Sequence, residues 1–311
     1  MFDETLQRLL PASVRVLHGA ELRNYTTFRL GGPCPALIDC PDAESLSASA
    51  RLLVEHGVPL MVIGQGSNLL VSDEGLDAVV LRYCSEDVPC ISFDGARVRV
   101  SGSTLLDDLA RITIENSMGD LSFCSGIPGT VGGAIAGNAG AFGKQIGDVV
   151  ESVRLMKLDG TLKVADADAL QFAYRSSVLK ETGAVVLDAV LKLKVEDRDA
   201  MLAERERILE LRSTKHPDWK TQPCAGSVFR NIEPTSAAER RQAAGWFLEE
   251  AGAKTFRVGE AHLFERHANI IIAEEGASAR DVFELSEKMI SAVRECFGFD
   301  LVREIKLIGR F

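Results

Sequence analysis

Two periods of apolar and polar residues run through this chain, and together they predict a mixture of helices and strands. Short apolar runs between glycine, proline or aspartate predict strands, and apolar residues three or four positions apart predict amphipathic helices. Strands are expected at Asn24–Gly32, Ala36–Cys40, Pro59–Gly64, Leu69–Val71, Ala78–Tyr83, Ile91–Phe93, Arg97–Val100, Val149–Leu158, Thr161–Val164, Ala184–Val195, Ala225–Asn231, Ala268–Ala273 and Leu301–Phe311. Helices are expected within residues 1–22 and at Asp42–His56, Ser103–Asn116, Ala167–Phe172, Asp199–Thr214, Ala237–Ala251 and Ser278–Phe297.

Capping and turn residues set several of these boundaries. Asp42 and Ser278 are suited to cap the helices that follow them, and Ser103 or Thr104 is expected to cap the next amphipathic helix. Asp159-Gly160 lies between two predicted strands and predicts a hairpin with a type I′ turn.

The stretch Ser125–Gly143 (SGIPGTVGGAIAGNAGAFG) holds seven glycines and no charged residue. It is too polar for a membrane span, and its apolar residues argue against disorder. Glycine lets main-chain N–H groups approach an anion, and Pro128-Gly129-Thr130 is suited to start a short helix whose N-terminus faces that anion. A diphosphate-bearing cofactor is the expected occupant. The alternative is a ligand-free helix crossing, but seven glycines exceed what one crossing needs.

A second glycine turn, Gly64–Asn68 (GQGSN), follows a predicted strand. It is not a Rossmann fingerprint, because no G-x-G-x-x-G opens a helix and no acidic residue ends a second strand at the expected distance. Alone this turn is a weak signal. Together with the longer glycine stretch it predicts a clamp that holds one diphosphate from two sides.

Composition narrows the class of protein. The chain has 311 residues, of which 46% are hydrophobic and 26% charged, so we expect two or three domains with ample core. The net charge of −10 argues against a nucleic-acid partner and requires a local basic cluster for any anionic substrate. Early acidic residues and the lack of a long apolar run predict neither a signal peptide nor a membrane segment.

Cysteine and histidine positions give no metal or disulfide signal. The seven cysteines are odd in number and form no C-x-x-C motif, which predicts reduced thiols in a cytoplasmic protein. His262 and His267, with Glu260 and Glu265, could offer metal ligands. Their spacing misses one helical turn and no third ligand is evident, so we expect structural or solvated histidines and no metal.

A series of motifs identifies a family. In chain order they are Thr26–Gly32 (TTFRLGG), Gly64–Leu70 (GQGSNLL), Gly126–Gly133 (GIPGTVGG), Tyr174–Ser177 (YRSS), Ala225–Asn231 (AGSVFRN), Ala244–Trp246 (AGW) and Arg303–Ile305 (REI). Each motif alone is unspecific, but the combination closely resembles the UDP-N-acetylenolpyruvoylglucosamine reductase family over nearly the whole chain.

The resemblance implies an α+β fold, in which a vanillyl-alcohol-oxidase-type, two-part FAD-binding region precedes a C-terminal α+β substrate domain. Residues 1–82 would form the first FAD-binding subdomain, to which the strand 301–311 returns. Residues 83–197 would form the second subdomain, and residues 198–300 the substrate domain. A change of composition near Glu196 agrees with the last boundary.

The resemblance also implies a reaction. NADPH would reduce noncovalently bound FAD, and the reduced flavin would reduce UDP-N-acetylglucosamine enolpyruvate to UDP-N-acetylmuramate for peptidoglycan synthesis. Ser227 matches the family's proton donor, Arg175 its catalytic arginine, and Glu304 the C-terminal glutamate that positions the serine or stabilises the enol. Without the family, the same residues would be read as a backbone-bonding serine, a surface ion pair and a solvated charge.

Further residues match binding positions of the family. Those expected at the cofactor are Gly64, Gln65, Gly66, Ser67, Asn68, Ser125, Gly126, Ile127, Pro128, Gly129, Thr130, Gly132, Gly133, Asn138 and Gly140. Those expected at the nucleotide-sugar substrate are Lys215, Asn231 and Tyr174. Lys220 and Arg230 lie nearby; they are expected to be solvated, with a contribution to substrate binding as the alternative. The oligomeric state stays open, and a monomer is plausible.

The chain departs from the family pattern at three points. No tyrosine follows Tyr174, so the chain resembles the branch without the mobile tyrosine lid. Ala273 stands where asparagine is frequent in the family. Ile232 replaces the proline of the usual Asn-Pro, which is expected to loosen the following loop.

Two other functions are compatible with these patterns. The first is another FAD-dependent oxidoreductase, many of which bind flavin covalently. No histidine lies between His56 and His216, which leaves Cys124 as a remote candidate for such a link. The second is a non-catalytic flavin- or nucleotide-sugar-binding protein, against which the presence of Arg175, Ser227 and Glu304 argues.

Overall fold

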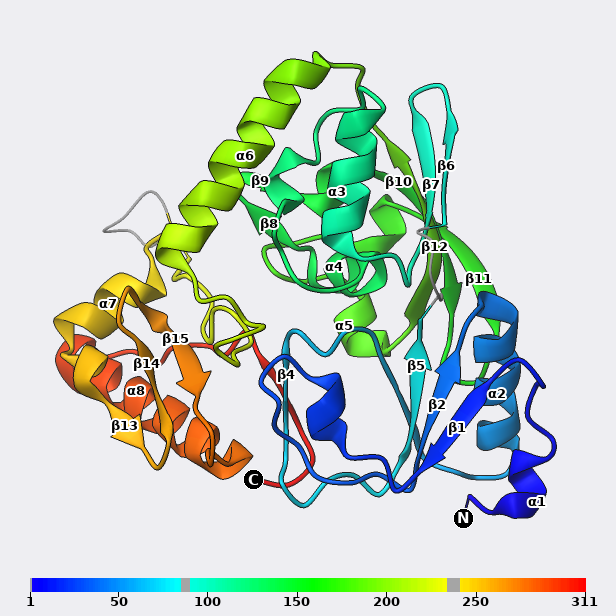
Figure 1. The fold of residues 1–311 in the computed structure, drawn as a ribbon, viewed down its shortest axis with the longest axis horizontal. Helices are drawn as coiled ribbons and strands as arrows, with labels where there is room; N and C mark the ends of the chain where they lie inside the picture. Colours follow the sequence, from blue (N-terminus) through cyan, green and yellow to red (C-terminus); the bar gives the residue numbers. More distant parts are fainter. Residues whose placement is uncertain (1, 85–89, 234–240) are drawn as a thin grey trace. The chain divides into compact units, whose positions relative to one another are not determined.

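The computed structural model describes residues 2–84, 90–233 and 241–311 (Figure 1). Contacts within the chain divide it into two compact units. Unit 1 comprises Met1–Ala20, Cys34–Gln65 and Asp77–Arg212, and unit 2 comprises Glu21–Pro33, Gly66–Leu76 and Ser213–Phe311. The three domain boundaries expected from the sequence stay a prediction.

A four-stranded sheet of order β1-β2-β5-β3 forms the first part of unit 1, and only β1 runs antiparallel to its neighbour. Helix α2 packs on it through the buried Leu46 and Leu53 (Figure 1). Asp42 caps α2 as predicted, because its carboxylate accepts the N–H of Ser45. The elements are α1 (Glu4–Gln7), β1 (Arg15–His18), β2 (Ala36–Cys40), α2 (Ala43–Glu55), β3 (Leu60–Ile63) and β5 (Val79–Tyr83).

An antiparallel sheet of order β11-β10-β12-β7-β6 forms the second part of unit 1. Helices α3 and α4 share its apolar core, to which Leu109 and Ile135 contribute. The strands are β6 (Ile91–Asp94), β7 (Arg97–Ser101), β10 (Val150–Met156), β11 (Leu162–Asp166) and β12 (Val185–Lys192), with a hairpin of β8 (Gly140–Ala141) and β9 (Lys144–Gln145). The helices are α3 (Leu106–Glu115), α4 (Val131–Gly137), α5 (Leu179–Thr182) and α6 (Arg198–Lys215), whose last three residues belong to unit 2. The short 3₁₀ turns are η2 (Ser122–Cys124), η3 (Ile146–Asp148) and η4 (Asp168–Leu170).

Unit 2 has its own sheet and its own core. Strands β13, β14 and β15 form an antiparallel sheet, and β16 pairs in parallel with β4. Ser278 caps α8 as predicted, and the carboxylate of Asp73 accepts the N–H groups of Ala279 and Arg280. The elements are η1 (Leu22–Tyr25), β4 (Leu69–Val71), α7 (Ala244–Glu250), η5 (Ala253–Thr255), β13 (Arg257–Val258), β14 (Ala261–Phe264), β15 (His267–Ala273), α8 (Ala279–Phe297) and β16 (Lys306–Ile308).

The segment Asn24–Gly32 is not a strand, contrary to the prediction. Its start is the 3₁₀ turn η1, and the N–H of Leu22 donates to Gly32 O while the hydroxyl of Thr26 donates to Leu30 O. These groups therefore form their hydrogen bonds within a compact loop rather than in a sheet.

Two local predictions about caps and turns are wrong. The helix α3 begins after Leu105, and neither Ser103 nor Thr104 caps it. The hairpin between β10 and β11 exists, but only Gly160 has a positive φ, at 79°, whereas a type I′ turn needs two such residues. The N–H of Gly160 donates to Lys157 O, so the turn is closed one residue earlier than expected.

Two predicted strands of unit 2 are shorter than expected. Ala225–Asn231 makes only isolated bridges, from Ser227 to Ile270 and from Phe229 to Arg303. The C-terminal strand is confined to β16.

The predicted helix Ala237–Ala251 is found as α7, and its first residues, 237–240, lie outside the described part of the chain.

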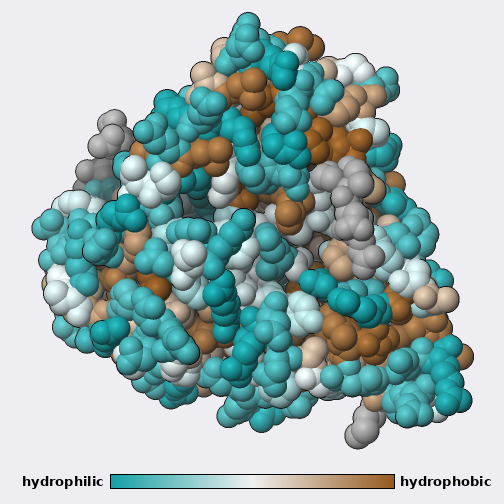
Figure 2. All heavy atoms as spheres, viewed as in Figure 1, coloured by the Kyte–Doolittle hydropathy of each residue, from teal (hydrophilic) through white to brown (hydrophobic). Residues whose placement is uncertain are grey.

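Among the described residues, no helix is both long enough and apolar enough to cross a membrane. Hydrophilic and hydrophobic residues are interspersed over the face shown in Figure 2.

Candidate active site

The glycine stretch of unit 1 forms a turn that enters helix α4. Thr130 caps this helix, and its hydroxyl accepts the N–H of Gly133. The N–H of Val131 donates to Thr104 O at 2.8 Å, and that of Gly132 donates to Gly102 O at 2.8 Å. Protein acceptors therefore occupy the N–H groups of the first helical turn, so they do not point at an anion as the sequence led us to expect.

The two glycine loops touch within unit 1. The N–H of Gly129 donates to Oε1 of Gln65 at 2.6 Å. A Cβ placed on Gly64 would lie 2.7 Å from Oγ1 of Thr130, so only glycine permits this approach. The predicted side-by-side placement of the two loops is therefore present at these residues.

Two hydroxyls at this place fit a polar cofactor. Among the described residues, Oγ of Ser125 and Oγ1 of Thr104 are buried without a hydrogen-bond partner. An unpaired buried hydroxyl costs about 1–3 kcal/mol in proteins, so a ligand that supplies partners is favoured there. Uncharged hydroxyls beside closely packed glycine loops are suited to donate hydrogen bonds to a dinucleotide such as FAD.

Arg175 lies in unit 1 and contacts two other predicted site residues, Gly140 and Tyr174. Its φ is 53°, and its Nη2 donates to Gly140 O at 2.7 Å. The guanidinium lies 5.5 Å from the centroid of the Tyr174 ring. The carbonyl of Arg175 accepts a hydrogen bond from Lys180. These contacts fix both the main chain and the guanidinium of the residue.

Asn138 has a structural position at the end of α4. It adopts the left-handed conformation with φ 46°, and its Nδ2 donates to Oε1 of Gln145 and to Ala173 O. Its Oδ1 accepts the N–H of Gly147. The side chain thus ties α4 to the segment before Tyr174, and its contact with a cofactor stays a prediction.

Ser227 and Glu304 lie on adjoining segments of unit 2. The N–H of Glu304 donates to Val228 O at 2.7 Å, directly after Ser227. Ser227 itself forms a bridge with Ile270 of β15. Two of the three predicted catalytic residues are therefore brought together, although 77 positions separate them in the chain (304 minus 227).

The second glycine turn reaches Glu304 in the same unit. Nδ2 of Asn68 donates to Glu304 O at 3.1 Å, and the N–H of Lys306 donates to Asn68 O at 2.9 Å. The carbonyl of Gly66 accepts the N–H of Thr27. Asn68 thus links the predicted cofactor loop to the C-terminal segment that carries Glu304.

Sequence reasoning missed Asn269, which orients the Ser227 segment. This buried asparagine accepts the N–H of Phe229 at 2.9 Å and donates to Phe229 O at 2.8 Å. Its own carbonyl accepts the N–H of Val228. A polar residue inside the apolar run of β15 was the signal that could have found it.

The predicted substrate residues lie in unit 2, apart from Tyr174. Oδ1 of Asn231 accepts the N–H of Ala244 at 3.2 Å, which places it at the start of α7. Lys215 is exposed at the end of α6. Lys220 lies 5.9 Å from the Trp219 ring centroid. Nε of Arg230 is buried and has no partner among the described residues, so the expectation of a solvated Arg230 is wrong for this atom.

The departures from the family pattern have plain structural positions. The N–H of Ile232 donates to Gln242 O at 2.9 Å, and the N–H of Gln242 donates back at 3.0 Å. A proline at position 232 would lack this donor, so the replacement ties the loop rather than loosening it. Ala273 is buried, and its N–H donates to Pro223 O.

Histidine and cysteine environments bear on the alternatives. Burial lowers the pKa of His267, whose ring centroid lies 5.5 Å from that of His216. In the described part of the chain no group of three histidine, cysteine, aspartate or glutamate residues could hold a metal ion. Cys124 is fully buried, and burial raises the pKa of its thiol, which disfavours the thiolate that a covalent flavin link would need.

Arginines of α6 were not expected at the glycine stretch. Arg205 forms an ion pair with Asp107, which also accepts the N–H of Gly126. Burial lowers the pKa of Arg212, whose Nη2 points to Phe123 O at 3.4 Å. No sequence signal distinguishes these arginines from the solvated charges of the same helix.

Two family models match the chain. Residues 35–166 match the FAD binding domain, and residues 217–308 match the C-terminal domain of UDP-N-acetylenolpyruvoylglucosamine reductase. Together with the structural match below, they confirm the expected α+β fold with an FAD-binding region and a separate C-terminal domain.

Individual proteins match over the full length. The chain is 35% identical over 309 residues to UDP-N-acetylenolpyruvoylglucosamine reductase of Bacillus velezensis, covering 99% of each chain. It is 37% identical over 306 residues to reductase 2 of Symbiobacterium thermophilum, covering 98% of this chain and 96% of the other. The crystal structure of UDP-N-acetylenolpyruvylglucosamine reductase from Thermus caldophilus superposes with a TM-score of 0.78 at 31% identity, covering 95% of this chain and 100% of that one. The chain therefore belongs to the UDP-N-acetylenolpyruvoylglucosamine reductase family.

Proposed function

We propose that this protein catalyses the NADPH-dependent, FAD-mediated reduction of UDP-N-acetylglucosamine enolpyruvate to UDP-N-acetylmuramate. Full-length family membership supports the reaction. The observation that carries it in the structure is the hydrogen bond from Glu304 N–H to Val228 O, which sets Glu304 beside the segment of Ser227. Because the product is a precursor of peptidoglycan made from soluble nucleotides, the proposed location is the cytoplasm.

FAD would be held noncovalently by the two glycine loops. Gly64 and Gln65 on one side and Gly129 and Thr130 on the other supply the closely packed backbone, and Ser125 supplies a buried hydroxyl. When bound, the flavin supplies the exchange of a hydride, first with NADPH and then with the enolpyruvyl double bond. All other steps fall to the side chains of this chain.

Ser227 donates the proton that completes the reduction. Addition of hydride to the β-carbon leaves negative charge on the α-carbon, and a hydroxyl suffices as the acid because that carbanion is a strong base. Asn269 holds the main chain after Ser227 through Val228 and Phe229, so the hydroxyl is carried on a fixed segment. Glu304, on the adjoining segment, orients the serine or the enol.

Arg175 stabilises the charge that spreads into the substrate carboxylate. Its planar guanidinium suits a carboxylate, and the hydrogen bond to Gly140 O holds the side chain before substrate binds. Organising a charged donor in advance lowers the free energy of the transition state, because no reorganisation is needed when charge develops.

Lys215, Asn231 and Tyr174 bind the nucleotide-sugar. Lys215 supplies positive charge for the diphosphate in a chain whose net charge is −10. Asn231 is oriented by its hydrogen bond to Ala244, and the Tyr174 ring stacks near Arg175.

Product analysis tests the proposal. Purified protein is incubated with NADPH and UDP-N-acetylglucosamine enolpyruvate, and the sugar is analysed by mass spectrometry. We expect a product heavier by the mass of H2 that co-elutes with UDP-N-acetylmuramate. Unchanged substrate, with flavin present and NADPH in excess, would contradict the proposed function.

A further inference from the structure

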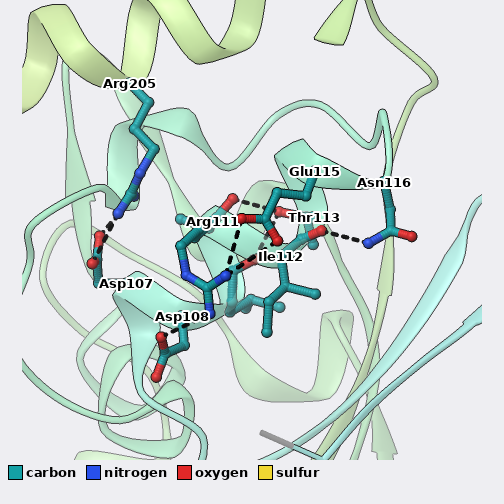
Figure 3. Close-up of polar contacts among 10 residues, drawn as sticks. Asp107, Asp108, Arg111, Ile112, Thr113, Glu115, Asn116 and Arg205 are labelled. Atoms are coloured by element: carbon teal, nitrogen blue, oxygen red, sulfur yellow. Dashed lines mark hydrogen bonds and ion pairs between the residues drawn. The ribbon is translucent and has the colours of Figure 1, made fainter.

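One carboxylate outside the predicted site holds the start of the glycine stretch. Figure 3 shows Asp107, on the first turn of α3, facing Arg205 of α6. Nη1 of Arg205 lies 2.7 Å from Oδ1 of Asp107, and Nη2 lies 3.0 Å from Oδ2. The N–H of Gly126 donates to the same Oδ1 at 2.7 Å. Asp107 thus joins three separate segments of unit 1.

The two partners of Asp107 act in different ways. The Arg205 side chain is only 12% exposed, so its charge needs the carboxylate as its counterion. The bidentate geometry also fixes the plane of the carboxylate, which leaves Oδ1 directed at Gly126. Arg205 orients Asp107, and Asp107 in turn holds the main chain of Gly126.

Gly126 has little freedom to move away from this position. Its φ is 73°, and a Cβ placed on it would lie 3.0 Å from both Arg212 Cδ and Leu209 Cδ2. Helix α6 therefore packs directly against the glycine stretch. A loss of the Asp107 contact would free Gly126 from α3 while α6 still packs against it, although the N–H of Leu106 would still hold Gly129 O.

The position of Gly126 also sets the position of Ser125. These residues are neighbours in the chain, and the Ser125 hydroxyl is one of the buried groups without a hydrogen-bond partner among the described residues. The N–H of Ser125 donates to the carbonyl of Ser122, the first residue of η2. The hydroxyl is therefore aimed by two anchors, one before it at Ser122 and one after it at Asp107.

The carboxylate of Asp107 is charged at neutral pH. Burial raises its pKa, but the hydrogen bonds from the Arg205 side chain and from Gly126 N–H, together with the charges of Arg205 and Arg111, lower it by more. The net result is a pKa below the ordinary value of aspartate. The acceptor for Gly126 N–H is thus present in its stronger, ionised form.

From these contacts we propose that Asp107 is a positioning residue for FAD, acting through Gly126 and Ser125, and that Arg205 supports it. This inference rests on the proposed function in taking FAD as the ligand of the glycine stretch. It concerns binding of the cofactor and not the chemical step.

Four variants separate the contacts. D107A removes the acceptor for Gly126 and the counterion of Arg205. D107N keeps a side-chain oxygen that can accept the Gly126 N–H but loses the charge. R205M leaves the carboxylate and removes its orienting partner. E115Q is the matched control, because it breaks the Arg111–Glu115 ion pair of 3.0 Å at the other end of the same helix (Figure 3).

Affinity for added FAD is measured by titrating each apoprotein and following quenching of flavin fluorescence, with the visible circular dichroism of the bound flavin as a second readout. We expect D107A to bind FAD about 10- to 100-fold more weakly, the range of a charge-assisted hydrogen bond. D107N should fall between D107A and wild type, and R205M should alter the dichroism of the bound flavin. E115Q should match wild type in both readouts.

The outcomes are distinguishable from one another. If Asp107 has only a structural role, D107A lowers the melting temperature of the apoprotein but leaves the FAD affinity and dichroism unchanged, and the inference is wrong. If D107A does not fold, D107N and R205M compared with E115Q decide in the same way. A wild-type protein that binds FAD but leaves the enolpyruvyl sugar unreduced contradicts the proposed function alone. A D107A protein that binds FAD as tightly as wild type contradicts this inference alone.

Discussion

The side-chain amide of Asn68 donates a hydrogen bond to the main-chain carbonyl of Glu304 at 3.1 Å, across 236 positions of the sequence. The same asparagine accepts the N–H of Lys306 through its carbonyl. A turn proposed to bind cofactor is thereby fixed to the segment of a proposed catalytic residue. A change at Asn68 should affect both the cofactor and the chemistry.

Asn68→Ala should weaken FAD retention and slow turnover. The variant loses one hydrogen bond, worth about 1 kcal/mol, and frees the carbonyl of Glu304. Flavin retained after repeated ultrafiltration and the kcat of the retained fraction are the measurements. Asn116→Ala is the control, because the side-chain amide of Asn116 donates to Ile112 O of the same helix and lies at an exposed helix end. Equal retention by the two variants would remove Asn68 from the account.

Ser227→Ala should separate the two half-reactions. Reduction of the flavin by NADPH needs no proton from Ser227 and should stay near the wild-type rate. Reoxidation by the enolpyruvyl sugar should slow by about 10²- to 10⁴-fold, the usual contribution of a general acid. Stopped-flow absorbance measures both rates, and Ser92→Ala on the exposed β6 is the matched change elsewhere. Unchanged reoxidation would exclude Ser227 as the proton donor.

Lys215→Ala should raise KM for the enolpyruvyl sugar more than it lowers kcat. An interaction with the diphosphate is made equally in the ground state and the transition state, so its loss acts on binding. Steady-state kinetics give both constants, with Lys163→Ala on the exposed β11 as the control. A fall in kcat at constant KM would instead assign Lys215 a part in the chemical step.

Asp39 should make folding stability depend on pH in the acid range. Burial raises the pKa of this carboxyl, but the hydrogen bonds and charges of Arg82 and Arg15 lower it by a larger amount. The pKa of Asp39 in the folded chain is therefore below the ordinary value. The folded state therefore binds the proton less readily than the unfolded state. The contribution is fully present above about pH 3.9, the unfolded pKa, and is lost as pH falls through the folded pKa.

Urea unfolding at pH 7 and near pH 3 checks this for the wild type and Asp39→Asn. We expect the variant to be less stable by about 1–3 kcal/mol at pH 7 and the gap to shrink at the lower pH. Asp94→Asn is the control, since in the described structure this residue ends the exposed strand β6. If the difference in unfolding free energy between wild type and Asp39→Asn is the same at both pH values, the ionisation of Asp39 does not contribute to stability.

Capping residues and apolar periodicity correctly predicted helices that depend on short-range interactions. The helices after Asp42 and Ser278 follow from caps and apolar periodicity, and both are found. The sequence predicts the segment Asn24–Gly32 as a strand that ends in a Gly-Gly turn, yet its main chain forms hydrogen bonds across a loop, as from Leu22 N–H to Gly32 O. Contacts between residues that are distant in the sequence decided that conformation.

The candidate site also contains residues that the sequence could predict and contacts that it could not. The motifs around Ser227 and Glu304 could be found from family resemblance, and the contact of their segments through Val228 could not. Asp107 and Arg205 lie on helices rich in charge, where most ion pairs are solvated, and only the fold reveals that this one meets Gly126.

The central claim is that reduced flavin in this protein passes hydride to an enolpyruvyl UDP-sugar, and one anaerobic measurement tests it most directly. The purified protein is reduced with one equivalent of NADPH and mixed with UDP-N-acetylglucosamine enolpyruvate while the flavin absorbance is followed. UDP-N-acetylglucosamine, which lacks the double bond, is the control. The account predicts rapid return of the oxidised flavin spectrum with the enolpyruvyl sugar and none with the control. A flavin that stays reduced with both sugars would contradict it.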